Sequence, residues 1–303
     1  MRHVKQAVKL LNNWLQRQYA LRNGAPLAPI FIIGSGRSGN TLLRRVLLNH
    51  PDIYIPPETY VLGPSISAFQ EHSHLEWNVI CRIVLAQFAF SEDFETFPTP
   101  YLRPLYRELL KTPPQQRSYD HIINKFYLSM AARAKPEATI WGDKTPLNVF
   151  YLDAIHSAFP GGRFVHIVRD GYDVVASYLK MGRYSRIADA SKRWLISVEL
   201  CQNFGRLHPE KYFELYYEDL VRNPAETVKK LCDFLSIDYS PVLIGPPVDA
   251  DALGDLYKRD HYQQVAQSIS ADSIGKGRKS LSGEDYRQVR ELISQKASKL
   301  GYN

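Results

Sequence analysis

The sequence of 303 residues contains only three cysteines, which are far apart and include no CxxC pair. This odd, scattered set suits neither a disulfide framework nor a zinc site, so we interpret Cys81, Cys201 and Cys232 as ordinary buried thiols. No cluster of residues has the spacing of metal ligands, and we expect no metal. No apolar run approaches the roughly 20 residues of a membrane-spanning helix, and no signal peptide is recognisable. The expected compartment is the cytoplasm.

Acidic residues are absent from the first 51 positions, which hold eight basic residues. The rest of the chain has 30 basic and 31 acidic residues, so the net charge of +7 comes from this front segment. Apolar residues recur at helical spacing from Val4 to Leu15, which predicts an amphipathic helix within residues 1–24. We favour packing of this helix on the main domain, with peripheral contact to an anionic membrane as the alternative. Without a basic stripe elsewhere, we expect no nucleic-acid partner.

Four apolar runs predict core strands, at residues 30–33, 139–146, 162–171 and 211–220. Helix-start signals follow the later three runs, at Thr145 and Pro146, at Asp170 and Asp173, and at Asn223, Pro224 and Glu226. This alternation predicts an α/β fold, a P-loop-like parallel β-sheet flanked by helices, as a single domain over residues 1–303. Ligands of such folds bind beyond the carboxyl ends of the strands.

Residues 64–135 differ in character, because they are rich in aromatic residues and prolines. The segment predicts a helical insertion rather than further sheet. Aromatic walls suit a lid over a substrate, so we place the insertion on the acceptor side and expect most of its rings to belong to the core.

A glycine-rich turn joins the first predicted strand to a helix. Gly34, Gly36 and Gly39 follow the strand at residues 30–33, and apolar residues then return at helical spacing. Such a junction directs backbone N–H groups and the positive end of a helix at one place, which suits an anion. A glycine turn that only lets a helix pack on a strand has the same pattern.

The turn differs from a nucleotide-binding P-loop in one position. Asn40 stands where the P-loop has the lysine that reaches the outer phosphates, which counts against an ATPase or a kinase. Arg37 lies inside the loop instead, and Ser38 and Thr41 add hydroxyl groups. The loop can therefore still hold a phosphate through its backbone.

Three further charged residues follow predicted strands or stiff turns. Glu58 comes after two prolines, and Lys144 directly precedes a predicted helix start. Arg169 ends a strand, with Ser177 two helical turns later. An arginine in this position is either a phosphate ligand or a solvent-exposed charge next to the helix cap Asp170.

In their order along the chain, these motifs resemble the PAPS-dependent sulfotransferases, more closely the tyrosylprotein and bacterial branch than the small-phenol cytosolic branch. PAPS is 3′-phosphoadenosine 5′-phosphosulfate, and PAP is the product that remains after transfer. The resemblance runs from about Ile30 to Leu281. "GSGRSGNTLL" is similar to the family's 5′-phosphosulfate loop and "IVRDGYDVVASY" to its 3′-phosphate motif. The implied donor contacts are Gly36, Arg37, Ser38, Gly39, Asn40 and Thr41 for the first, and Arg169 and Ser177 for the second.

The same resemblance implies roles for single residues. "HPDIYIPPET" is similar to the segment with the catalytic glutamate, which implies Glu58, and "GDKTP" to the segment with a catalytic lysine, which implies Lys144. "LYYEDLVRNPAETVKKLCDFL" places Tyr217 near the adenine. "SIGKGRKSLS" resembles the loop that closes over the nucleotide, and it leaves open which of Lys276, Arg278 and Lys279 contacts the 3′-phosphate.

These roles imply in-line transfer of a sulfuryl group from PAPS to an acceptor hydroxyl. Glu58 acts as the base, while Arg37 and Lys144 stabilise negative charge, and no metal is needed. The acceptor is left open among a sugar, a peptide tyrosine, a lipid headgroup and a small alcohol. The alternatives are a P-loop kinase or nucleotide hydrolase, and a catalytically silent nucleotide-binding protein.

Overall fold

The computed structural model describes residues 19–98, 101–247 and 269–302. The predicted front helix lies mainly outside these residues. Its last part, residues 19–24, is not helical, because Ala20 forms a parallel bridge with Ser118 at the start of the insertion's last helix.

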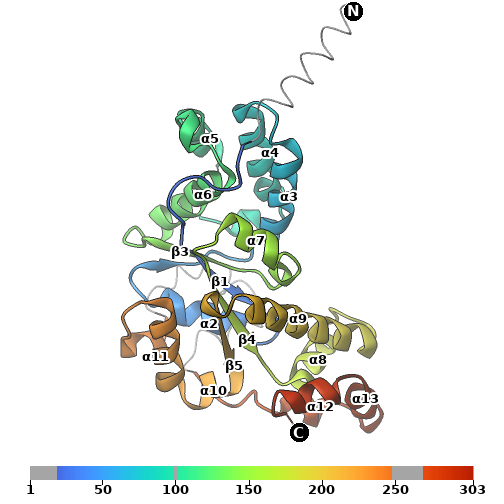
Figure 1. The fold of residues 1–303 in the computed structure, drawn as a ribbon. Helices are drawn as coiled ribbons and strands as arrows, with labels where there is room; N and C mark the ends of the chain where they lie inside the picture. The colour runs from blue at the N-terminus through green and yellow to red at the C-terminus, as the bar shows by residue number, and fades with distance from the viewer. Residues whose placement is uncertain (1–18, 99–100, 248–268, 303) are drawn as a thin grey trace, which may run out of the picture.

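The core is a parallel sheet of five strands in the order β2-β3-β1-β4-β5 (Figure 1). The strands are β1 (Ile30–Ile33), β2 (Ile53–Tyr54), β3 (Ile140–Lys144), β4 (Arg163–Val168) and β5 (Tyr212–Tyr216). The α/β prediction and its four strands are confirmed. The edge strand β2 was not predicted, because two residues are too few to show a periodic pattern.

Helices follow the strands and flank the sheet. They are α2 (Asn40–Leu48), the 3-10 helix η3 (Pro146–Phe150), α7 (Leu152–Ala158), α8 (Gly171–Lys180), α9 (Ile187–Leu207), α10 (Tyr217–Arg222), α11 (Pro224–Leu235), α12 (Lys276–Ser280) and α13 (Gly283–Lys299). Asp170 caps α8 as predicted, by accepting a hydrogen bond from the Tyr172 N–H. Asn223 makes no such side-chain bond to α11, and Glu226 pairs with Lys230 one turn later instead.

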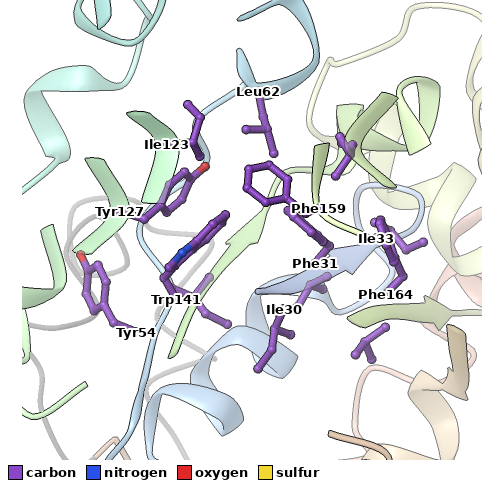
Figure 2. Close-up of a cluster of buried hydrophobic side chains, with 14 of the residues drawn as sticks. Ile30, Phe31, Ile33, Tyr54, Leu62, Ile123, Tyr127, Trp141, Phe159 and Phe164 are labelled. Atoms are coloured by element: carbon purple, nitrogen blue, oxygen red, sulfur yellow. The ribbon is translucent and has the colours of Figure 1, made fainter. Parts of the chain in front are cut away.

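The insertion is helical, as predicted. It contains α3 (Leu62–His72), α4 (Trp77–Ala89), α5 (Arg103–Leu110) and α6 (Tyr119–Ala134), which lie together at the top of Figure 1. Its rings pack into the main core, where Tyr127 stacks on Trp141 with ring centroids 4.2 Å apart (Figure 2). The central strand contributes Phe31, which is fully buried beside Phe159 and Phe164. The expectation that most of these rings are core is confirmed.

The register of the sheet brings the predicted site residues to one edge. Ile32 pairs with Lys144 at the end of β3, and Ile33 pairs with His166 near the end of β4. The chain therefore leaves β1, β3 and β4 on the same side, where the glycine loop, Lys144 and Arg169 follow. Within the described ranges, no helix is long and apolar enough to cross a membrane.

Candidate active site

A cavity of about 360 Å³ lies at the carboxyl edge of the sheet. It is lined by nine of the residues predicted from the sequence: Gly36, Arg37, Gly39, Asn40, Thr41, Glu58, Arg169, Tyr217 and Lys276. Lys144 and Ser177 contact the wall residues Glu58 and Arg37, whereas Ser38 and Arg278 do not line this cavity. Most of the predicted site is thus assembled around one space.

The glycine loop presents the start of α2 to the cavity. Gly39 adopts a left-handed conformation (φ 102°), and α2 has neither a side-chain cap nor an acidic residue in its first turn. The Asn40 amide donates to the Ser35 carbonyl (2.7 Å) and so closes the loop on itself. Asn40 thus has a role within the loop, and the backbone N–H groups of the helix start remain for an anion.

Arg37 connects the glycine loop to α8. It has a left-handed backbone (φ 68°), an unfavourable conformation for a residue with a side chain. Its Nε donates to the Ser177 hydroxyl (3.1 Å), and its carbonyl accepts from Arg169 Nη1 (3.3 Å). The two predicted anion sites therefore adjoin, with Arg37 between them.

Arg169 is held on several sides, and one of its donors has no partner in the part of the chain that the structure describes. Its Nη2 donates to Asp173 (3.2 Å) and to the Ser273 carbonyl (2.8 Å), and its guanidinium lies 4.4 Å from the centre of the Tyr217 ring. Its Nε–H is buried and has no acceptor among the described residues. A buried donor without a partner is costly, so this N–H suits an anionic oxygen from a ligand.

Tyr217 packs directly on the glycine loop. A Cβ atom at Gly39 would lie 2.5 Å from the Tyr217 ring, so only glycine fits here. The Tyr217 hydroxyl bonds to Ser273, which places the ring between the glycine loop and residues 269–279, here called the late loop. Tyr217 is therefore well placed to border a planar group in the cavity.

The late loop is fixed to the start of α8 by Asp173. This buried carboxylate accepts from the Gly275 N–H (2.9 Å) and the Gly277 N–H (2.6 Å). Lys276, between them, lines the cavity. Arg278, one of the three candidates for the 3′-phosphate, instead pairs with Asp170 (2.9 Å), and its guanidinium lies over Tyr172, so the structure does not bring it into this cavity.

Glu58 and Lys144 form a tight ion pair at the other side of the cavity. Lys144 Nζ lies 2.5 Å from Glu58 Oε1, and the two side chains are 1% and 15% exposed. Burial opposes ionisation of Glu58, but the charge and hydrogen bond of Lys144, with contributions from Tyr60 and Arg44, outweigh it and hold the pKa of Glu58 below its ordinary value. Glu58 is thus a carboxylate that faces the cavity with a cation behind it.

Several wall residues were not predicted. They come from the turn after Glu58, from η3, from α8 and the segment after it, from α9 and from the late loop: Tyr60, Pro146, Leu147, Tyr178, Met181, Arg183, Tyr184, Arg193, Ile269, Ser270, Asp272 and Ser273. Tyr178 directly follows Ser177 in α8, but adjacent residues of a helix point in different directions, so helical spacing did not indicate it, and the loop residues show no local pattern. No described residue of the 64–135 insertion lines this cavity, and the place of the insertion on the acceptor side stays a prediction.

Two histidines that could replace Glu58 as a base lie outside the cavity wall. His50 accepts from the Asp52 N–H, and burial is the main reason that its pKa is lowered. His166 is fully buried and shares a hydrogen bond with Tyr212. In the described parts of the chain, no group of three or more His, Cys, Asp or Glu residues is arranged to hold a metal ion.

Residues 29–241 match the sequence model of the Sulfotransferase family. A putative protein-tyrosine sulfotransferase of Caenorhabditis briggsae is 22% identical over 281 residues, which cover 90% of this chain and 89% of the relative. The nodulation protein NoeE of Sinorhizobium fredii is 28% identical over 300 residues, and the match covers 90% of this chain and 65% of that protein. The match to the protein-tyrosine sulfotransferase of Drosophila melanogaster covers 78% of this chain but only 43% of the relative.

The fold agrees with these matches. The sulfotransferase domain of the Synechococcus PCC 7002 olefin synthase superposes with a TM-score of 0.60 at 26% identity, over 92% of this chain and 98% of that domain. The family match covers well over half of the sequence and includes the glycine loop, Glu58, Lys144 and Arg169. The chain belongs to the sulfotransferase family.

Proposed function

We propose that this chain transfers a sulfuryl group from PAPS to an acceptor hydroxyl and releases PAP. The observation that carries the proposal is the buried Nε–H of Arg169, which has no acceptor among the described residues and lies beside the glycine loop, with Glu58, whose pKa is lowered, in the same cavity. A donor with phosphate groups at both ends of its ribose needs two adjoining anion sites. The family membership supports the same reaction.

PAPS fits the residues that surround the cavity. Residues 36–41 and the start of α2 receive the 5′-phosphosulfate, and Arg169 with Ser177 receives the 3′-phosphate. Tyr217 borders the adenine, and Lys276 adds charge from the late loop. The Lys that a P-loop kinase needs for a γ-phosphate is absent from the loop, which disfavours ATP as the substrate.

The ion pair provides the chemistry of transfer. As the acceptor oxygen bonds to sulfur, the bond between sulfur and the 5′-phosphate oxygen breaks, and the hydroxyl proton passes to Glu58. Lys144 keeps Glu58 ionised before the reaction, and Lys144 and Arg37 offset negative charge at the transferred group and the leaving phosphate. No step in this scheme uses a metal.

The acceptor is proposed only as a hydroxyl compound. Peptide tyrosine is one candidate, since several relatives carry the name protein-tyrosine sulfotransferase. Leu147, Met181 and Tyr184 add apolar and aromatic surface to the cavity wall, which suits the body of an acceptor of any of the four classes.

Two measurements test this proposal. PAP without metal should raise the melting temperature of the protein, whereas ATP with magnesium should not. Radiolabelled PAPS, offered with a tyrosine peptide, a sugar, a lipid alcohol and a small alcohol, should label at least one acceptor. Stabilisation by ATP and magnesium alone would instead indicate a kinase or hydrolase, and PAP binding without turnover would indicate a silent protein.

A further inference from the structure

Asp143 is a fully buried carboxylate next to the ion pair, and both of its oxygens are occupied. Its Oδ2 accepts from the Thr59 hydroxyl (2.8 Å) and the Tyr127 hydroxyl (2.6 Å), and its Oδ1 accepts from the Asn148 amide (2.7 Å). Asp143 does not line the cavity, and successive residues of a strand point to opposite faces, so its side chain and that of Lys144 point apart.

Two of these three donors, Thr59 and Asn148, come from segments that carry the site, whereas Tyr127 comes from α6 of the insertion. Thr59 directly follows Glu58, and Asp143 directly precedes Lys144. Asn148 belongs to η3, whose first residues line the cavity. A second link joins the same segments, because the Thr59 N–H donates to the Thr145 hydroxyl (3.1 Å). The Asp143 carboxylate therefore links three segments: the one that carries Glu58, the one that carries Lys144, and η3 in the cavity wall.

The buried Asp143 carboxylate and the backbone of Tyr60 both carry a free-energy cost. Burial raises the pKa of Asp143 above its ordinary value, although hydrogen bonds from Tyr127, Thr59, Thr145 and Asn148 oppose that shift. A buried carboxylate is seldom better for stability alone than an apolar side chain of the same size. Tyr60, on the other side of Thr59, has a left-handed backbone (φ 60°), which the surrounding bonds must maintain.

We propose that Asp143 is a positioning residue for sulfuryl transfer. By holding Thr59 on one oxygen and Asn148 on the other, it sets the separation of Glu58 and Lys144 and fixes η3 against the cavity. The inference rests on the proposed function, in which Glu58 is the base and Lys144 is its partner.

Two substitutions separate positioning from general stability. Thr59→Val and Tyr127→Phe each remove one hydroxyl from the same oxygen of Asp143, but only Thr59 adjoins Glu58. The measurement is the pKa of Glu58 in the full chain, followed by NMR of protein with labelled glutamate carboxyl carbons. Thr59→Val should raise this pKa by on the order of one unit, because the Lys144 contact loosens. Tyr127→Phe and the rescue variant Thr59→Ser should leave it near the parent value.

The Glu58 pKa values of these variants decide whether Asp143 positions the ion pair. An unchanged Glu58 pKa in Thr59→Val, or an equal rise in Tyr127→Phe, would overturn the proposal. If Thr59→Val does not fold, Thr59→Ala takes its place in the same comparison. The proposed base is tested separately, by measuring the turnover of Glu58→Gln with labelled PAPS. Near-parental turnover would reject Glu58 as the base. The NMR result would then show only whether Asp143 positions Glu58 against Lys144.

Discussion

Replacing Arg169 with alanine tests the 3′-phosphate site most directly. The Arg169 Nε–H has no acceptor among the described residues, while its other nitrogens hold Asp173, Ser273 and the Arg37 carbonyl. Truncating one partner of a buried charge pair costs about 2 kcal/mol or more, which corresponds to a roughly 30-fold rise in the Kd of PAP.

The loss must be assigned to the phosphate rather than to a loosened loop. Calorimetry of parent and mutant with PAP and with 5′-AMP, which lacks the 3′-phosphate, makes this distinction. The four affinities form a thermodynamic cycle in which the removed phosphate takes the place of a second mutation. Loss of the loop contacts of Arg169 weakens both ligands alike, whereas loss of the phosphate contact weakens PAP alone. We therefore expect the preference for PAP over 5′-AMP to fall about 30-fold, the factor that corresponds to about 2 kcal/mol.

Arg278 offers a matched control. It also pairs with an aspartate, Asp170, and its guanidinium lies 4.2 Å from the centre of the Tyr172 ring, but it lies outside the cavity wall. Arg278→Ala should keep the preference for PAP. Equal losses for PAP and 5′-AMP in Arg169→Ala, or a lost preference in Arg278→Ala alone, would refute the assignment of the 3′-phosphate to Arg169.

Three further outcomes are expected. Glu58→Gln should lower kcat by about 10²- to 10⁴-fold per PAP-binding molecule and leave the Kd of PAP unchanged; near-parental kcat would contradict a base role. Asp173→Asn should speed hydrogen exchange of the Gly275 amide about tenfold, because this amide donates to the Asp173 carboxylate. Equal exchange rates in mutant and parent would show that Asp173 does not hold the late loop. Glu214 has a pKa lowered from 4.5 to about 2, because hydrogen bonds and charge from His166 outweigh burial. Glu214→Gln should therefore cost up to about 3 kcal/mol in urea unfolding at about pH 5. The parent has this advantage above pH 4.5 and loses it as the pH falls toward 2, so a pH-independent difference would contradict the linkage.

The sequence alone was sufficient for the features that depend on near neighbours. The apolar run of β1, the glycines after it and the cap at Asp170 are set by residues within a few positions of one another. Strand ends in a parallel sheet share one edge, so the approximate meeting of the glycine loop, Lys144 and Arg169 also followed from the alternation of strands and helices. The helix-start signal at Asn223 and Glu226 did not produce a side-chain cap, and Glu226 instead pairs with the exposed Lys230 one turn later.

Only the tertiary structure decided the contacts between distant segments. Glu58 and Lys144 are 86 positions apart, and Arg278 is 108 positions from the Asp170 carboxylate that turns it away from the cavity. The rings of the insertion are built into the core, while residues of η3, of α9 and of the segment after α8 form the remaining wall. Local spacing does not encode these choices, because long charged and aromatic side chains reach whichever partner or burial site the packed helices and sheet bring close.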